Sequence, residues 1–455
     1  MIRKKSKQKQ PTIWIATDDL QVKPQITFYA KLNSILAKID FGDQVRKLCE
    51  AYYSAKANCR PPIDPEIYFK MLLVGFFENI GSERGIAARC GDSLSVRSFL
   101  GYLLTESTPE HSTLSVIRHR LPQSIYSQIF SIILKALKQH GLVKGKNLAF
   151  DTSIMEANAS LRSLQNRMTE ESYAKYIKDL AQQAGVNPED KAAVARFDRK
   201  RADRKTSNDE WYNPHDPDAK VGKTKDGATD MVYKPEHVVD LDTGAIIDTD
   251  MLLGDCADTN HLAERIVNAQ IRLNEISDNP VEEQPSETIT ADKGYYNVQE
   301  LTDIQSIGFE TVIPDKDFKR NMSKLPDECA LAVELAHSSV SSQEGKALLK
   351  RRGSHVERSF AHVLDCGGAR RTTLRGGENN KKRYLIATAC YNLSLLMRTI
   401  FGIGTPKQFL ANLILSFKLI FNALISLKKQ LLPKINPIFF LFCQRTVKMK
   451  FAHSF

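Results

Sequence analysis

Three carboxylates stand where strands or a helix could bring them into one site. Asp151 follows the apolar run 148–150, and Asp292 closes the run 288–291; both runs are typical of strands. Glu357 lies in the segment RRGSHVERSFAHVLD, which we expect to be helical. Because α/β sheets place ligand sites at the carboxyl ends of their strands, the aspartates could meet there, and gathered carboxylates could hold a divalent cation.

Each of these carboxylates also has an ordinary structural interpretation. Asp151 before Thr-Ser could be a cap or turn residue, and Asp292 before Lys-Gly could be a turn former. Glu357 beside Arg358 could be half of a solvated ion pair, which contributes little stability. The residue types alone leave the catalytic and the structural interpretation open. The choice between them depends on which secondary-structure elements carry these residues.

The composition describes a large, basic globular protein. The chain has 455 residues, of which 42% are hydrophobic and 26% charged, which excludes a single small module, wholesale disorder and a fibrous repeat. Lys and Arg number 64 against 53 Asp and Glu, a formal net charge of +11. This surplus favours a polyanionic partner, and nucleic acid is the first to consider.

The cysteines and the apolar segments predict a cytoplasmic protein without a membrane partner. The 8 cysteines are scattered singly, which is typical of reduced thiols rather than a zinc site or a disulfide framework. No apolar run typical of a secretory signal follows the basic N-terminus. Lysines within 409–442 leave uncharged runs of about ten residues, short of the roughly 18 that a membrane span needs, so we expect a buried or amphipathic tail.

The first part of the chain predicts successive helices. Asp64, Ser82 and Ser112 are candidate N-caps, and Pro65 suits a first helical turn. Short helices joined by glycine-containing turns resemble helix-turn-helix architecture. The basic side chains available here could contact phosphates or form the solvated face of a helical bundle: Arg84, Arg89, Arg97, Arg118, His119 and Arg120.

From about residue 146 the hydrophobic pattern changes to that of strands. Two strands joined at 242–244 are followed by strands that alternate with helices, which predicts a mixed α/β sheet. We expect His237, on one of these strands, to be a hydrogen-bonded structural residue. Between about 155 and 228 the pattern predicts a largely helical insertion, in which Trp211 and Tyr212 could stack on a flipped base or pack within the subdomain.

Together these segments resemble the bacterial insertion-sequence transposases of the DDE type. LAFDTS supplies Asp151, TITADKGYYN supplies Asp292 and RRGSHVERSFAHVL supplies Glu357, in the order Asp, Asp, Glu of that family. PIDPEIYFKMLLVGFFENIGSERGIAARC, with RSFLGY and PEHSTLSVIRHRL, is similar to the family's helical N-terminal domain. The resemblance covers roughly 45–400. It implies an α/β RNase H-like catalytic domain, a mixed five-stranded sheet flanked by helices with a helical insertion, preceded by an all-α domain.

The expected domain organisation follows from this resemblance and from the composition. Its parts are a basic arm and first helix over 1–45, a helical domain of the DNA-binding type over 46–125, a linking helix over 126–146, the catalytic domain over 147–400 with its insertion at about 155–228, and a basic and apolar tail over 401–455.

The resemblance implies metal-dependent DNA chemistry. Two Mg²⁺ ions about 3.5–4 Å apart, for which Mn²⁺ can substitute, would activate a water and stabilise the leaving oxygen. Asp151 and Asp292 would be metal ligands, and Glu357 would bind the second ion. The family's site hydrolyses DNA at the transposon end to free a 3′-OH and then directs that hydroxyl onto target DNA.

The expected partner is double-stranded DNA, both transposon ends and target, in the cytoplasm at the nucleoid. Joining two ends in one complex implies a homodimer or higher oligomer, for which the tail over 409–442 could supply an interface. Two alternatives stay open: a DNA-binding protein of transposase descent that no longer cuts, and a nuclease without strand transfer. The intact acids favour an active enzyme over the first alternative.

The basic residues around the third acid depart from the family pattern Tyr-x2-Arg-x3-Glu-x6-Lys. Its Tyr, Arg and Lys positions hold Lys350, Gly353 and Leu364. Arg351 or Arg352 could replace the missing arginine in a shifted register. The missing lysine could be replaced by His362, Arg370 or Arg371. The candidate DNA-contacting residues are Lys293, Arg351, Arg352, Arg358, Arg370, Arg371 and Arg375. The basic run could be a phosphate-binding patch or a solvated face: Arg370, Arg371, Arg375, Lys381, Lys382 and Arg383.

Overall fold

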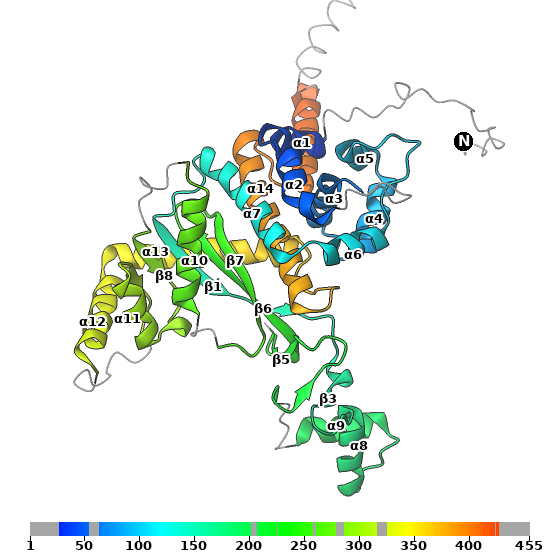
Figure 1. Cartoon of the computed structure of the whole chain (residues 1–455), viewed down its shortest axis with the longest axis vertical. Coiled ribbons are helices and arrows are strands. Elements are labelled where there is room, and N and C mark those ends of the chain that lie inside the picture. The colour runs from blue at the N-terminus through cyan, green and yellow to red at the C-terminus, as the bar shows by residue number, and fades with distance from the viewer. Residues whose placement is uncertain are drawn as a thin grey trace, which may run out of the picture.

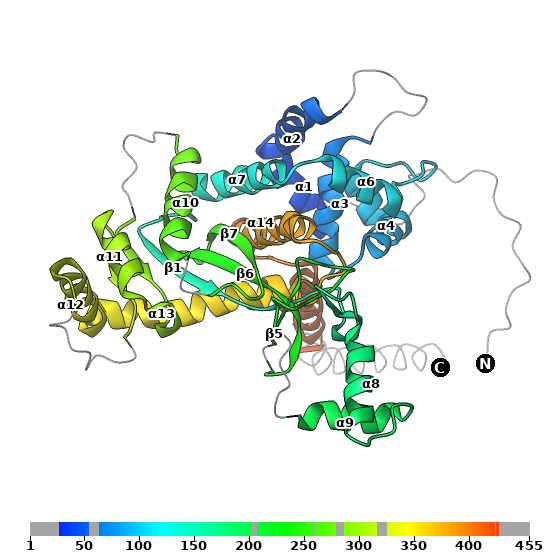
Figure 2. The same ribbon diagram turned by 60° about the horizontal axis from the view of Figure 1, so that its bottom comes forward.

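The computed structural model describes residues 27–53, 63–201, 207–224, 226–257, 261–278, 286–315, 325–423 and 425–426. Residues 1–26, which belong to the expected basic arm, and the whole tail beyond residue 426 lie outside the described residues. Figures 1 and 2 show a helical N-terminal region, a domain built around a sheet, and an arm with α8 and α9 that projects from that domain.

The N-terminal region is helical, as expected. Its helices are α1 (Phe28–Lys38), α2 (Phe41–Cys49), α3 (Pro65–Phe77), α4 (Glu83–Asp92), α5 (Leu94–Leu100), α6 (His111–Arg120) and α7 (Gln123–Gln139), with a 3₁₀ turn over Glu50–Tyr52. The predicted caps Asp64 and Ser82 are confirmed, because their side chains accept hydrogen bonds from the first turns of α3 and α4. The prediction for Ser112 is wrong: α6 begins at His111 and its N-cap residue is Glu110, so Ser112 lies inside the helix.

Three of the basic side chains that could contact phosphates or form a solvated face are bound within the protein. Arg118 is paired with Glu83 at 2.9 Å, and Arg89 is paired with Glu78. Arg97 is buried and donates to two carbonyl oxygens of the following loop. These guanidinium groups hold helices and loops together; Arg97 and Arg118 are buried, whereas the side chain of Arg89 is 39% exposed. The side chains that stay at the surface are Arg84, His119 and Arg120.

The second part of the chain forms a mixed sheet. Its main strands are β1 (Asn147–Thr152), β6 (Thr229–Asp240), β7 (Ile246–Leu253), β8 (Thr288–Thr290) and β9 (Glu310–Val312). Strand β6 is antiparallel to both β1 and β7, whereas β1, β8 and β9 are parallel to one another. The order β7-β6-β1-β8-β9, flanked by helices, confirms the expected RNase H-like architecture.

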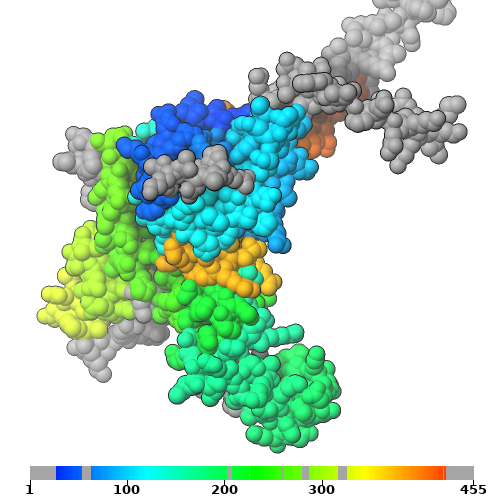
Figure 3. All heavy atoms as spheres, turned by 45° about the vertical axis from the view of Figure 1, so that its right-hand side comes forward, coloured from blue at the N-terminus to red at the C-terminus, as the bar shows by residue number. Residues whose placement is uncertain are grey.

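Two short strands extend this sheet and change the expected insertion. Strands β2 (Met155–Glu156) and β5 (Lys220–Lys223) both pair with Val232 of β6, on its two sides, so the sheet contains 7 strands rather than five. The expected insertion over 155–228 therefore begins and ends in the main sheet. Between these strands lie α8 (Tyr173–Gln183), α9 (Lys191–Lys200), a 3₁₀ turn over Leu161–Ser163, and the paired strands β3 (Gln165–Asn166) and β4 (Trp211–Tyr212). The insertion is thus mixed rather than largely helical, and in the space-filling view it forms a separate lobe (Figure 3).

The aromatic residues of the insertion form its small core. Trp211 is only 5% exposed, and its ring lies 5.2 Å from that of Tyr173 and 5.4 Å from that of Tyr176. The packing interpretation of Trp211 is therefore confirmed, because a ring enclosed in this way has no free face for a flipped base.

Helices cover both faces of the sheet. They are α10 (Leu262–Glu275), α11 (Val298–Ser306), α12 (Asp327–Ser341), α13 (Gln343–Phe360), which continues into a π-helical turn over Ala361–Cys366, and α14 (Gly377–Phe401). Neighbouring residues of β6 show which helix lies on which face, because side chains alternate along a strand. Glu236 contacts Arg265 of α10 at 3.3 Å, and His237 is hydrogen-bonded to Ser359 of α13 at 2.8 Å. Helices α10 and α13 therefore lie on opposite faces.

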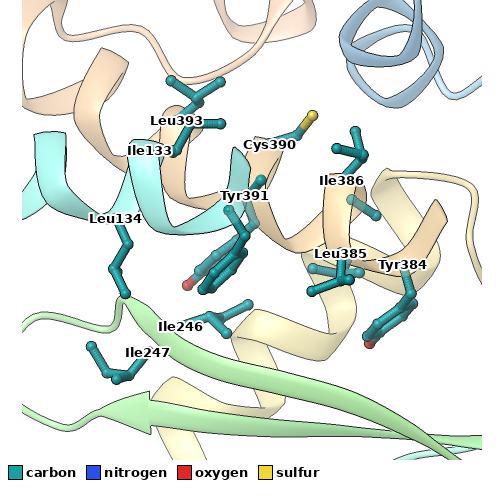
Figure 4. Packing of buried hydrophobic residues seen from close by; sticks show 14 of the residues in the cluster. Ile133, Leu134, Ile246, Ile247, Tyr384, Leu385, Ile386, Cys390, Tyr391 and Leu393 are labelled. Atoms are coloured by element: carbon teal, nitrogen blue, oxygen red, sulfur yellow. The ribbon is translucent and has the colours of Figure 1, made fainter. Parts of the chain in front are cut away.

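Helix α14 joins the helical region to the sheet. Its side chain Tyr391 lies beside Ile246, at the start of β7, in Figure 4, and its hydroxyl donates to the carbonyl of Gly244 at 3.0 Å. The buried Asn392 accepts a hydrogen bond from the backbone N–H of Ile246 at 3.0 Å and donates one to its carbonyl at 2.8 Å. Since α14 also contacts α3 and α7, both regions share one hydrophobic core.

The helical part of the tail that the structure describes is exposed, so of the two expected alternatives, a buried or an amphipathic tail, the buried one is wrong. Residues 406–423 are helical, and the large apolar side chains exposed there include Leu410, Leu413, Ile414, Phe417, Ile420 and Phe421. By length and composition alone the stretch Gly377–Ala423 could cross a membrane, but 67% of its apolar window is buried within the protein. That burial is typical of a core helix, here α14.

His237 is the residue expected to be structural, and its surroundings agree. Its ring nitrogens lie 2.8 Å from the hydroxyls of Ser359 and Tyr384, and the ring stacks on Phe360 at 4.0 Å. Burial lowers the pKa of His237 to about 3. The folded protein therefore holds this imidazole neutral in mild acid, where an exposed histidine gains a proton.

This difference predicts a loss of stability in acid. The unfolded chain binds a proton at His237 below about pH 6.5, whereas the folded chain does not, so the free energy of unfolding should fall as pH drops from 6.5 toward 3. The contribution approaches about 1.4 kcal/mol per pH unit. Denaturant unfolding at pH 7, 6 and 5 should give a flatter profile for His237→Gln than for wild type. The exposed control His119→Gln should keep the wild-type profile, and equal slopes for all three proteins would contradict the prediction.

Candidate active site

Asp151 and Asp292 lie at neighbouring strand ends because β1 and β8 pair in parallel. The register places Ala149 opposite Thr290, and each aspartate follows two residues later. Parallel strands run in the same direction, so both carboxylates leave the sheet at the same edge. The structure therefore brings two of the three predicted acids together.

The carboxylate of Asp151 is largely buried and has several partners. Oδ1 accepts a hydrogen bond from the backbone N–H of Thr152 at 2.9 Å, and Oδ2 lies 2.7 Å from Nη2 of Arg352. Burial raises the pKa of Asp151 to about 6, opposed by the positive charge of Arg352 and assisted by the negative charge of Asp292. A second positive charge at this edge would lower the repulsion between the aspartates.

Tyr295 supports Asp151, and the sequence analysis did not identify it. Its hydroxyl donates to Oγ1 of Thr152 at 2.7 Å and lies 3.4 Å from Oδ1 of Asp151, while its ring packs edge-to-face on Phe150 at 5.1 Å. A 3₁₀ turn over Lys293–Tyr295 places it there, and the side chain of Asp292 accepts a hydrogen bond from that turn. Asp292 is therefore also the turn former that its sequence context allowed. The sequence signal that could have identified Tyr295 is its position, an aromatic residue three positions after the candidate acid Asp292.

Glu357 lies on α13, the helix that covers the same face as the side chain of Asp151. Arg351 of α13 pairs with Asp242 at 2.9 Å, and His355 lies against Gly244; both partners belong to the β6–β7 turn, near the start of β1. At about 100° per residue, Glu357 lies on the flank opposite His355 and about 140° around the helix from Arg352, the residue that contacts Asp151. It is exposed, and within the described residues no hydrogen bond or ion pair joins it to Asp151 or Asp292.

The two aspartates have the chemistry of a site for a hard divalent cation. Carboxylate oxygens at one sheet edge are the ligands that Mg²⁺ prefers, and burial keeps the pKa of Asp151 above its usual value although the charge of Arg352 opposes that shift. In the part of the chain that the structure describes, no cluster of three or more His, Cys, Asp or Glu side chains could hold a metal ion. Asp151 pairs instead with Arg352. A complete three-acid set would require Glu357 to approach.

The candidate DNA-contacting residues divide by their position. Arg352 lies at the aspartates, and the exposed Lys293 follows Asp292 directly. Arg370 is paired with Asp365 at 2.8 Å and also donates to the carbonyl of Ile154. Arg351 is at the β6–β7 turn, at the other end of β1. The remaining candidates are exposed: Arg358, Arg371 and Arg375.

The expected basic patch over 370–383 does not form one surface. Lys382 is buried and donates to the carbonyl of Arg118 at 3.1 Å, and Arg383 donates to that of Ile80 at 2.9 Å. Lys381 is paired with Asp250 at 3.1 Å. These cations are on the first turns of α14, and Lys382 and Arg383 tie it to the N-terminal helices. The prediction was wrong for them because a run of charge does not show which side chains face inward.

Two transposase family models match successive parts of the chain, the helical region first and the sheet domain second. Residues 20–120 match the family described as Transposase domain (DUF772), and residues 198–393 match the Transposase DDE domain. No curated protein and no solved structure gives a significant match. The second match includes Asp292 and Glu357; Asp151 precedes it, but β1 pairs directly with strands inside the match. With both transposase domains in one chain, this protein belongs to the DDE transposase family.

Proposed function

We propose that this chain is an active transposase that binds the terminal inverted repeats of its insertion sequence and catalyses DNA cleavage and strand transfer. The observation that carries this proposal is the parallel pairing of β1 with β8, which places Asp151 beside Asp292 at the strand ends. Family membership supplies the expectation that DNA is the substrate. The protein would act on double-stranded DNA in the cytoplasm, at the nucleoid.

The side chains at this edge have separable roles in the proposed reaction. Asp151 and Asp292 would hold divalent metal, and Glu357 would complete the set from its helix flank. Tyr295 keeps Asp151 and Thr152 in position through its hydroxyl. Mg²⁺, or Mn²⁺ in its place, would supply the Lewis acidity that makes a water or a 3′-OH nucleophilic and stabilises the leaving oxygen.

A DNA-binding protein of transposase descent that no longer cuts is the second candidate. The separation of Glu357 from the aspartates among the described residues favours it, because an incomplete set of acids would not support catalysis. A nuclease without strand transfer would need the same acids. It differs only in the product, since it leaves the freed 3′-OH unjoined to target DNA.

Cleavage of the element's own ends tests the proposal. Duplexes from the DNA that flanks the coding sequence should be cut by the full chain with Mg²⁺ and joined to a target plasmid. Asp151→Asn, Asp292→Asn and Glu357→Gln should each bind these duplexes but cut them at least about a hundredfold more slowly, because each loses a metal ligand.

Two matched variants control for the loss of a surface carboxylate. Asp303→Asn on α11 and Glu344→Gln on α13 are exposed and lie outside the site, so their cleavage rates should stay at the wild-type level. Wild-type protein that binds the ends but never cuts them with Mg²⁺ or Mn²⁺ would exclude the enzyme and leave the DNA-binding remnant. Cleavage without joining would identify the nuclease.

We also propose that the protein acts as a homodimer or higher oligomer on DNA, with the tail helix as one interface. The side chains of Leu410, Leu413, Phe417 and Ile420 recur at the three- and four-residue spacing of a coiled-coil seam and are 58%, 39%, 75% and 60% exposed. Exposed apolar stripes of this kind mark protein interfaces, because burial of apolar surface is favourable.

This interface can be tested by sedimentation of the full chain with an end duplex. Wild type should sediment as an oligomer, whereas Leu413→Asp with Phe417→Asp should shift toward the monomer, because two charges would be buried in the seam. Asn412→Asp adds a charge to the same helix outside that spacing and should leave the oligomer intact. A monomeric wild-type complex with both ends bound would overturn the proposal.

A further inference from the structure

The contact between Arg352 and Asp151 is at the centre of the proposed active site. Nη2 of Arg352 lies 2.7 Å from Oδ2 of Asp151, and the two side chains are 14% and 23% exposed. A guanidinium and a divalent cation cannot both bind this oxygen closely, because their charges repel each other. Arg352 thus occupies the coordination position that a metal at Asp151 would need.

The guanidinium itself is incompletely satisfied. Its Nε is buried and, in the part of the chain that the structure describes, has no hydrogen-bond partner. An unpaired buried donor is unfavourable, and arginine has five N–H donors in a planar fork. A phosphate diester offers two oxygens with the geometry to engage such a fork, which makes it a better partner than a single carboxylate oxygen.

We propose that Arg352 blocks metal binding at Asp151 in the DNA-free protein and moves to a DNA phosphate when an end binds, which frees Asp151 for the cation. This inference rests on the proposed function, because it takes DNA and a divalent metal as the ligands of this site. Its thermodynamic consequence is coupling: DNA raises the affinity for metal, and metal raises the affinity for DNA by the same factor.

Arg351 provides a matched control on the same helix. It is the adjacent residue and carries the same charge, but it pairs with Asp242 at the β6–β7 turn rather than with Asp151. Substitution of either arginine removes one positive charge from α13. Only the substitution of Arg352 removes the group that competes for Asp151, so the two variants separate this contact from a general effect of charge.

The experiment is a Mn²⁺ titration of the full chain followed by electron paramagnetic resonance of the free ion. It is done without DNA and with a duplex that already ends at the element's 3′-OH, so that no hydrolysis occurs. Without DNA, Arg352→Gln should bind Mn²⁺ about tenfold more tightly than wild type, within the usual range of coupling between sites. Arg352→Ala should show the same gain in Mn²⁺ affinity, and Arg351→Gln should bind Mn²⁺ as wild type does.

The same titration measures the coupling. The DNA-induced gain in Mn²⁺ affinity should be large in wild type and at least about fivefold smaller in the Arg352 variants, because their site is open before DNA binds. Equal Mn²⁺ affinity of wild type and both Arg352 variants without DNA would overturn the inference. So would an equal gain in Arg351→Gln and Arg352→Gln.

Asp151→Asn separates this inference from the proposed function. If it loses a Mn²⁺ site that wild type shows with DNA, while the Arg352 variants bind as wild type does, the metal site stands and the arginine block fails. If no Mn²⁺ site depends on Asp151 even with DNA bound, the proposed function fails together with the inference.

Discussion

The parallel pairing of β1 with β8 is the constraint on which the site depends. Neighbouring β6 is antiparallel to β1, so β8 alone among the partners of β1 sends its carboxyl end to the same edge. The short pairing of 288–290 with 147–149 therefore fixes where Asp151 and Asp292 stand. Both strands are buried, which makes a slip in register costly, since it would turn the apolar side chains to the wrong face.

The packing of α13 on the sheet explains why this one helix positions both Glu357 and Arg352. Asp151 faces α13 because it lies opposite His237 in the register, and His237 is hydrogen-bonded to Ser359 of that helix. The same helix carries Arg352 and Glu357, five residues apart, on its inner face and on its flank. A rotation or shift of α13 would therefore change both of these side chains together.

Much of this arrangement could be predicted from local sequence. Caps such as Asp64 and the glycine turn at 242–244 act within a few residues, and the acids follow recognisable apolar runs. The partner of Arg352 and the strand pairing of β2 and β5 could not, because residues far apart in the sequence create them. Ser112 shows a smaller limit: several residues near a helix start can serve as a cap, and pattern alone does not rank them.

The basic residues show most clearly what composition conceals. The chain carries a net charge of +11, which suits a DNA partner. Arg97, Arg118 and Lys382, however, bind carbonyl and carboxylate groups inside the helical region. Those internal cations connect the N-terminal helices to one another and to α14, and through α14 to the sheet. Part of the positive charge therefore holds the catalytic domain and the helical domain in one body. The charge left for DNA is smaller than the total, and its position relative to Asp151 matters more than its amount.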